Sequence, residues 1–362
     1  MSSTSSPVRV GLIGCGEIAQ VVHIPTLNLL STFFTITYLC DVSPAALKSC
    51  QGRALGTPKT TGDPVELCSS PEVDVVFVLN SNEYHADRAI LALQNDKFVF
   101  LEKPVALNQR DLNRVRDVET ASKGQVMVGY MRRYAPAFAQ FREEIGDRND
   151  ILFARVRDII GPNIAFVSQS GTFPERFTDF PAEQIEDKEA RFKDQIAQAL
   201  AECGKQPSDQ LAKFWSLLSG LGTHDLSAMR EALGMPDKVI GVSPTFPFWN
   251  VLFQYPGFVV SYESGIDNVP RFDAHIEVYT PKKTIKIEYD TPYVKGLPTK
   301  LYITSNKDGV LEQSGVRTTY EDSYTIELLA LHETITGGKP VKTTIEDAAN
   351  DMKLLEMIVR AV

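Results

Sequence analysis

The feature that most constrains the fold is a glycine-rich turn between two apolar runs near the start of the chain. The run Val8–Ile13 leads into Gly14-Cys15-Gly16-Glu17-Ile18-Ala19, and a second run, Phe34–Cys40, ends on Asp41. The order of strand, glycine turn, helix, strand and terminal acid predicts a dinucleotide-binding βαβ unit. Its glycines permit the tight turn and a close approach of the backbone to a pyrophosphate, and Ala19 lets helix and strand pack closely. The pyrophosphate is expected on the free N–H groups of a helix that begins near Glu17. The cofactor contacts predicted in this turn are Gly14, Gly16, Glu17, Ile18 and Ala19.

Asp41 bears on which coenzyme is bound. A carboxylate at the end of the second strand accepts hydrogen bonds from the adenosine ribose hydroxyls and repels a 2′-phosphate. Val42 and Ser43 follow it, and the next basic residue is Lys48. NAD is therefore favoured over NADP. The alternative is that Asp41 only caps the next helix, although Ser43 before Pro44 fits the cap and first-turn positions better.

The composition excludes two classes of partner. With a net charge of -9 over 362 residues, the chain lacks the basic surface that nucleic acid requires. No apolar stretch reaches the roughly 20 residues that span a bilayer, and the polar start MSSTSSP is expected to be a disordered tail and not a secretion signal.

Five cysteines without a C-x-x-C pair predict a reducing, cytoplasmic compartment. Metal-ligand spacing is absent among the cysteines and histidines, so no metal is expected.

The first 129 residues alternate strand and helix. Continuous apolar strands between amphipathic helices predict a doubly wound parallel sheet covered on both faces, and hence an α/β Rossmann domain over residues 1–129. The expected segments after Asp41 are helix 44–55, an extended piece near Lys59, strand 75–79, helix 84–94, strand 98–101, helix 108–122 and strand 126–129.

Beyond Tyr130 the pattern changes, and residues 130–362 are expected to form a second, α+β domain. Short strand-like segments with close turns predict a large, open, mostly antiparallel sheet. The stretch Pro181–Gln210 is expected to form helical excursions over that sheet, and Thr172–Phe214 is a candidate lid. The expected strands are 152–160, 239–242, 251–255, 258–264, 274–279, 284–289 and 301–305. In the last of two closing helices, one apolar face is expected to be core or to pack on the first domain: Ile345, Ala348, Met352, Leu355, Val359 and Val362.

Charged and polar residues follow two of the predicted strands. Ligands of an open parallel sheet bind outside the carboxyl ends of its strands, so Glu102-Lys103 points to the cofactor crevice. A lysine there donates to a substrate hydroxyl or carbonyl and exchanges a proton if its pKa is depressed, with Glu102 orienting it. The alternative is a surface ion pair of almost no energetic value. Asn80 and Asn82 are expected to line the nicotinamide or ribose site, and His85 is either a packing residue or a cofactor contact.

A further candidate is His224, in Gly222-Thr223-His224-Asp225. A histidine in the first turn of a helix has its pKa depressed by the helix dipole, which suits a neutral imidazole that accepts a proton. Taken alone, such a histidine is more often structural than catalytic.

Together these motifs resemble the glucose-fructose oxidoreductase, inositol dehydrogenase and rhizopine-catabolism (Gfo/Idh/MocA) family over nearly the whole chain. The matching elements are Gly14-x-Gly16-x-x-Ala19, Asn82-x-x-His85, Glu102-Lys103-Pro104, Gly129-Tyr130-Met131-Arg132-Arg133-Tyr134, Gly222-x-His224 and Thr336-Gly337-Gly338-Lys339-Pro340. The resemblance implies reversible hydride transfer with sugars or cyclitols, and a homo-oligomer, dimer or tetramer, formed through the C-terminal sheet. It also implies that Lys103 contacts nicotinamide ribose and substrate before a cis Pro104, and that His224 is the acid/base. Tyr130 and Arg133 are then expected near the substrate.

One departure from the family pattern concerns the acid/base group. Where relatives carry an Asp four residues before the histidine, this chain has Gly220, and Ser227 stands where many carry another Asp. Asp225 cannot simply replace the missing acid, because neighbouring helix positions point about 100° apart. His224 should then be the weaker base, leaving Lys103 with more of the proton transfer.

These observations lead to the hypothesis of an NAD-dependent oxidoreductase acting on a CH–OH or C=O group of a sugar, polyol or cyclitol. Two alternatives stay open: an NADP-dependent dihydrodiol or ketose dehydrogenase, and a non-catalytic regulator of the same fold that senses a dinucleotide. Polar residues of the second domain are candidates for the substrate pocket: Arg155, Asn163, Asn250 and Tyr262.

Overall fold

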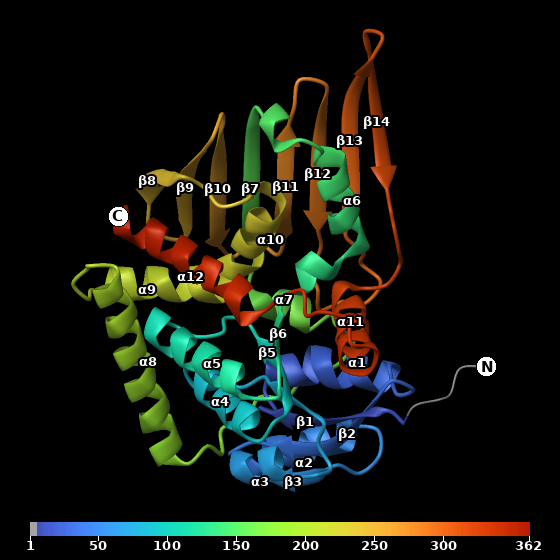
Figure 1. Ribbon diagram of the computed structural model, residues 1–362, viewed down its shortest axis with the longest axis vertical. Coiled ribbons are helices and arrows are strands. Elements are labelled where there is room, and N and C mark those ends of the chain that lie inside the picture. Colours follow the sequence, from blue (N-terminus) through green and yellow to red (C-terminus); the bar gives the residue numbers. More distant parts are fainter. Residues whose placement is uncertain (1–5) are drawn as a thin grey trace. The chain divides into compact units, whose positions relative to one another are not determined.

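The computed structural model describes residues 6–362, which form two compact units (Figure 1). The first contains the chain up to Gly129 together with residues 171–199 and 327–349. The second contains Tyr130–Ser170, Leu200–Ile326 and Asn350–Val362. Residues 171–199 and 327–349, which the sequence analysis placed in the second domain, are thus part of the first unit. Apart from Ser6 and Pro7, the expected N-terminal tail lies outside the described residues.

The first unit is built on a six-stranded sheet ordered β3-β2-β1-β4-β5-β6. Every strand pair in it is parallel, which confirms the predicted doubly wound sheet. The strand order reverses between β1 and β4, and in such sheets ligands bind at this point, outside the carboxyl ends of the strands. The strands are β1 Val8–Ile13, β2 Phe34–Cys40, β3 Lys59–Thr61, β4 Val75–Val78, β5 Phe98–Glu102 and β6 Val126–Gly129. The helices between them are η1 Ala19–His23, α1 Ile24–Leu29, α2 Pro44–Arg53, α3 Pro64–Ser69, η2 Asn82–Tyr84, α4 His85–Gln94 and α5 Gln109–Ala121.

Local sequence explains how several of these helices begin. Ser43 is the N-cap of α2, its hydroxyl accepts a bond from Ala46 N, and Pro44 occupies the first turn, as the sequence predicted. Helical turns start at Glu17 and widen into the π-helix η1, where Ile24 N bonds the carbonyl five residues back. Pro25 has no N–H to bond the carbonyl four residues back, and a widened turn just before it accommodates that loss.

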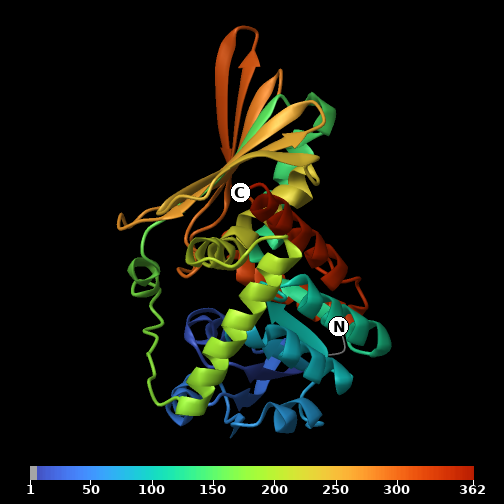
Figure 2. The ribbon, with the colours of Figure 1, turned by 90° about the vertical axis from the view of Figure 1, so that its left-hand side faces the viewer.

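Residues 171–199, here called the strap, were expected over the antiparallel sheet but belong to the first unit. The strap starts as an extended chain and continues as α8, Ala182–Glu202, of which residues up to 199 lie in this unit (Figure 2). The helical character predicted for Pro181–Gln210 is therefore confirmed for α8, while the expected position over the antiparallel sheet was wrong. Polar spacing alone predicts a helix without saying which surface that helix covers.

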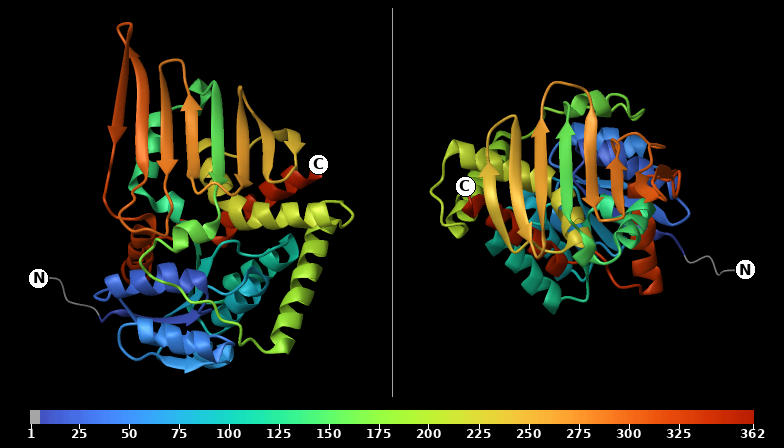
Figure 3. Two further views of the ribbon diagram at one scale, coloured as in Figure 1. Left: turned by 180° about the vertical axis from the view of Figure 1, so that it is seen from behind. Right: turned by 90° about the horizontal axis from the view of Figure 1, so that it is seen from above.

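The second unit contains an eight-stranded sheet ordered β14-β13-β12-β11-β7-β10-β9-β8 (Figure 3). Among the described strands of this second sheet, only the pairing of β10 with β7 is parallel, so the expected mostly antiparallel sheet is confirmed. The strands are β7 Phe153–Ile160, β8 Lys238–Ser243, β9 Phe248–Tyr255, β10 Phe258–Ile266, β11 Phe272–Tyr279, β12 Lys283–Tyr289, β13 Lys300–Lys307 and β14 Val310–Val316. Its helices are η3 Met131–Tyr134, α6 Pro136–Ile145, η4 Arg148–Asp150, α7 Asn163–Val167, α9 Asp209–Leu217, η5 Leu218–Gly222 and α10 Thr223–Leu233. Two further helices, α11 Ser323–Gly337 and α12 Ile345–Arg360, are divided between the units, because residues 327–349 belong to the first.

Two details differ from the sequence-based expectation. Strand β14 was not expected, because its residues are almost all exposed and carry no alternating apolar pattern. The predicted apolar face of α12 is buried from Ile345 to Val359, whereas Val362 lies beyond the helix and is exposed. Within residues 6–362, no helix combines the length and apolar character needed to cross a membrane.

Candidate functional site

The glycine turn after β1 has the geometry that a dinucleotide loop requires. Gly14 has φ 104°, and a Cβ there would lie 2.5 Å from the backbone nitrogen of Asn80. A Cβ on Gly16 would meet nothing within 4 Å, and Gly16 lines a pocket. Ala19 is fully buried, consistent with close packing of helix on strand. The turn therefore fits the close approach of a pyrophosphate to its backbone.

Asp41 lies at the end of β2 with its carboxylate held in place. Oδ2 accepts a hydrogen bond from Cys15 N at 2.7 Å, and Oδ1 accepts one from Ser43 N at 2.9 Å. Burial raises the pKa of Asp41 against the opposing effect of these backbone bonds, and the nearby charge of Asp179 raises it further. The carboxylate joins the glycine loop to the next turn and keeps lone pairs for ribose hydroxyls.

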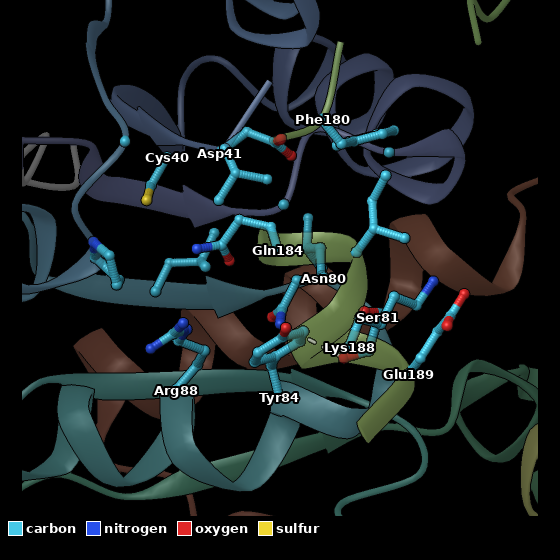
Figure 4. Close-up of a pocket in the computed structure, with 18 residues that line it drawn as sticks. Cys40, Asp41, Asn80, Ser81, Tyr84, Arg88, Phe180, Gln184, Lys188 and Glu189 are labelled. Atoms are coloured by element: carbon cyan, nitrogen blue, oxygen red, sulfur yellow. Dashed lines mark hydrogen bonds between the residues drawn. The ribbon is translucent and has the colours of Figure 1, made fainter. Parts of the chain in front are cut away.

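A pocket of about 700 Å³ lies at this edge of the sheet (Figure 4). Four of the predicted cofactor residues line it: Gly14, Gly16, Asp41 and Asn80. Other lining residues come from the segments that follow β2 and β4 and from η2 and α4, among them Val42, Ser81, Tyr84 and Arg88. A third group comes from the strap: Phe180, Gln184, Ile185, Lys188 and Glu189. The volume and the mixture of apolar and polar walls suit one half of a dinucleotide.

The strap is anchored to the helices on either side of this pocket. Near its start, Arg53 Nη1 donates to Thr172 O at 2.6 Å, and Glu175 N donates to Gln20 Oε1 at 2.8 Å. In α8, Tyr84 Oη donates to Asp187 at 2.7 Å. Arg191 and Gln195 continue the anchoring toward α4, to Asp87 and to the Glu83 carbonyl. No sequence motif marks these contacts, which is why the sequence analysis missed the strap as a pocket wall.

Glu102, at the end of β5, is bonded to a histidine that the sequence analysis did not consider. Its Oε1 lies 2.8 Å from Nε2 of His23, and both side chains are buried. Burial alone would raise the pKa of Glu102, but the hydrogen bond and charge of His23 outweigh it and hold that pKa below its usual value. His23 therefore fixes the ionised carboxylate that precedes Lys103.

Replacing His23 with Leu is expected to destabilise the protein by about 1–3 kcal/mol at neutral pH, because a buried carboxylate loses its partner. The wild-type contribution of Glu102 is present above its unfolded pKa and fades as pH falls. In the variant, Glu102 has lost His23 and burial raises its folded-state pKa. The loss of stability relative to the wild type should therefore become smaller toward acid pH. Urea unfolding at several pH values measures this.

The double variant His23→Leu with Glu102→Gln serves as the control, since a neutral amide is cheaper to bury than an unpaired carboxylate. At neutral pH its free energy of unfolding should lie between that of the single variant and that of the wild type. A single variant whose deficit is independent of pH would contradict the assigned pairing.

His85 connects the ends of two strands. Its Nδ1 lies 2.7 Å from the carbonyl oxygen of Pro104, and its Nε2 lies 2.9 Å from that of Asn80. Burial lowers the pKa of His85, outweighing two carbonyl contacts that favour the charged ring. The ring thus positions the segments after β4 and β5, the latter including Lys103. The Lys103-Pro104 bond is cis, as the resemblance implied, and Lys103 is partly exposed at the carboxyl edge of the sheet.

The local surroundings of His224 differ from the expectation in one respect. It is the second residue of α10, but α9, the π-helix η5 and α10 follow one another without a break. Gly222, the residue before α10, itself has helical dihedral angles. The free helix N-terminus expected at His224 is therefore wrong, because the first N–H groups of α10 continue an existing helix and carry no terminal dipole. His224 is partly exposed.

Asp225 points into a buried ionic cluster and does not replace the missing family acid. It forms a very short ion pair with Arg132, whose other terminal nitrogen lies 3.3 Å from Asp158 Oδ2. The guanidinium also lies 4.8 Å from the centre of the Tyr289 ring. Burial raises the pKa of Asp225 far above its usual value; Arg132 opposes that rise and the charge of Asp158 adds to it. Arg132 thus holds together two acids from α10 and β7.

Tyr130 and Arg133, expected near the substrate, are both buried in the second unit. The Tyr130 ring lies 5.4 Å beneath the Arg133 guanidinium, and Arg133 Nε donates to Glu231 at 2.5 Å. Burial, followed by the charge of Asp351, raises the pKa of Tyr130 well above its usual value. Their role toward substrate stays a prediction.

Of the remaining predicted site residues, Ile18 and Glu17 lie in the first helical turns after the glycine loop, and Asn82 lies in η2 directly after the Asn80 segment. Within residues 6–362, no group of three His, Cys, Asp or Glu side chains is arranged to hold a metal ion.

Residues 8–130 match the GFO_IDH_MocA family model, described as an oxidoreductase family with an NAD-binding Rossmann fold. Over these residues the chain is similar to the Gfo/Idh/MocA oxidoreductase family. Similar curated proteins include the inositol 2-dehydrogenase of Salmonella typhimurium, 31% identical over 139 residues, which cover 38% of this chain and 41% of that protein. The myo-inositol 2-dehydrogenase of Thermotoga maritima is 30% identical over 171 residues, covering 45% of this chain and 49% of that protein. These matches span less than half the length of the curated relatives.

Several solved oxidoreductase structures resemble the chain over nearly its full length. Levoglucosan dehydrogenase, in complex with NADH and levoglucosan, covers 98% of this chain and 97% of its own, with a TM-score of 0.74 and 17% identity. The 3-ketoreductase KijD10 of Actinomadura kijaniata, in complex with NADP and TDP-benzene, covers 98% of both chains with a TM-score of 0.72 and 17% identity. At this identity the likeness shows the fold.

Proposed function

We propose that the protein is an NAD-dependent oxidoreductase that transfers a hydride between the nicotinamide and a CH–OH or C=O group of a sugar, polyol or cyclitol. The observation that carries this proposal is the pocket lined by Gly14, Gly16 and Asp41, at the same sheet edge as Lys103. Two of the proteins to which the chain is similar are named for inositol and for levoglucosan, which supports a polyhydroxylated substrate class.

In the proposed reaction, Asp41 holds the adenosine ribose and the glycine turn holds the pyrophosphate. A bound nicotinamide would supply the hydride acceptor for the substrate carbon, at its C4 position. Lys103 Nζ takes up the hydroxyl proton as the C–H bond breaks and the C=O bond forms. His224 is a second candidate for this proton transfer, on the strength of the resemblance alone.

The test is a screen of the purified protein with NAD against inositols, aldoses, anhydrosugars and dihydrodiols, following NADH absorbance. We expect turnover with at least one cyclic polyol or sugar. If NADH binds in a fluorescence titration but no compound is turned over, the dinucleotide-sensing alternative gains support. Binding of neither NADH nor NADPH would overturn the proposed function.

A further inference from the structure

We propose that Asp179, on the strap, is a second determinant of coenzyme choice, and that its carboxylate acts with that of Asp41 to exclude a phosphate at the 2′ position of the adenosine ribose. This inference rests on the proposed function, because it requires that the pocket of Figure 4 receives an adenine dinucleotide.

The place where a 2′-phosphate would bind follows from the βαβ unit. The acid after the second strand accepts bonds from the ribose hydroxyls, so the 2′ position faces the turn between that strand and the next helix. A phosphate there depends on free N–H groups at the helix start and on a nearby arginine. In this chain the turn is Asp41-Val42-Ser43, followed by α2.

Carboxylates already occupy the donors of that turn. Ser43 N donates to Asp41 at 2.9 Å, while Ser43 Oγ donates to Asp179 Oδ1 at 2.5 Å. Ala45 N donates to Asp179 Oδ2 at 3.0 Å, and Ala46 N donates to Ser43 Oγ at 3.0 Å. Pro44 has no N–H to offer. Asp179 therefore bonds the start of α2 as an external anion would, and an incoming phosphate would have to displace it.

The charge on this side of the pocket is negative. The hydrogen bonds from Ser43 and Ala45 lower the pKa of Asp179, so its carboxylate is ionised at neutral pH. Two basic residues, Arg88 and Lys188, also line the pocket. Figure 4 shows Arg88 next to Tyr84, across the pocket from Asp41, and its guanidinium lies 5.5 Å from the centre of the Tyr84 ring. Neither of the two joins the bonds at the start of α2.

The strap keeps Asp179 in this position. Contacts on both sides of it, from Arg53 and Gln20 before it and from Tyr84 after it, tie the strap to the helices around the pocket. Moving the carboxylate away would break its two bonds to α2 and disturb these anchors. Discrimination against the phosphate thus comes from a residue more than 130 positions beyond Asp41 in the chain.

The test compares dissociation constants for NADH and NADPH, measured by fluorescence titration of the whole protein. The wild type is expected to bind NADH more tightly. Asp179→Asn keeps the shape of the side chain and removes its charge. It should lower the ratio of the NADPH dissociation constant to that of NADH by about tenfold, mainly through tighter NADPH binding, because one nearby unit charge is lost. Asp179→Ser should act in the same direction, and both variants are checked by thermal melting.

Glu175→Gln is the matched control, because Glu175 is another acid of the strap but contacts Ser49 and Arg53 instead of the start of α2. It should leave the ratio unchanged. An unchanged ratio in both Asp179 variants, or an equal change in Glu175→Gln, would overturn the inference while leaving the proposed function standing. A wild type that prefers NADPH would overturn the inference together with the NAD dependence of the proposed function, but not the hydride transfer. Failure of the wild type to bind either coenzyme would overturn the proposed function itself.

Discussion

Replacing Lys103 with Met is expected to lower turnover by about two to four orders of magnitude, the range that a positioned proton-transfer group contributes. Methionine has a similar length and cannot take up a proton. Lys103 follows Glu102, which His23 holds, and precedes Pro104, whose carbonyl contacts His85, so the backbone around it is well supported. NADH affinity should change by less than about threefold, since the glycine turn and Asp41 are untouched.

Lys123→Met is the matched control, because that side chain is 88% exposed and forms only a long ion pair with Asp96. Steady-state kinetics with the substrate found by the screen, together with NADH titration, separate turnover from binding. Near-normal turnover in the Lys103 variant would refute its role, whereas loss of NADH binding would show that the residue serves the coenzyme and not the proton.

Replacing Arg132 with Met is expected to destabilise the second unit by about 3–5 kcal/mol at neutral pH, because two buried acids lose their shared cation. Burial already raises the pKa of Asp225 far above its usual value. Without Arg132 the pKa of Asp225 should rise further, and an acid with a raised folded-state pKa weakens stability above its unfolded pKa. The deficit should therefore shrink as pH falls and Asp225 becomes neutral.

Arg142→Met provides the comparison, since Arg142 is 44% exposed and its ion pair with Glu231 is worth less than about 1 kcal/mol. Urea unfolding between pH 5 and pH 8, followed by tryptophan fluorescence, reports on the second unit, where Trp215 and Trp249 lie. An Arg132 variant as stable as the Arg142 variant at pH 7 would mean that the cluster does not hold α10 to β7.

Much of the fold could be predicted because its signals are local. The apolar runs of β1, β4 and β5 stand between amphipathic helices, and a parallel sheet follows from that alternation. The helix cap at Ser43 and the glycine turn are likewise determined by residues that are adjacent in the sequence. Strand β14 carried no such signal because it is exposed on both faces. The π-helix η5 carried none either, because it is a local widening within a continuous helical segment.

The residues of the candidate site likewise fall into those that local sequence predicts and those that only packing brings together. Gly14, Gly16, Asp41 and Lys103 could be predicted to lie together from their positions after apolar strands, because parallel strands bring their carboxyl ends to one edge. His23 could not be connected to Glu102, since 79 residues separate them and only packing joins them. The dipole assigned to His224 failed because the residues before it are themselves helical.

By itself, then, the sequence determined a parallel sheet with a dinucleotide-type glycine turn and the edge of that sheet where the candidate site lies, since turn geometry and hydrophobic periodicity act over a few residues. Only the tertiary structure decided that the strap walls the pocket, that Asp179 caps α2, and that Arg132 joins two buried acids. These contacts link segments that are distant along the chain. Hydrogen bonds and ion pairs between such segments form only once the hydrophobic core has brought them together, so no local pattern records them.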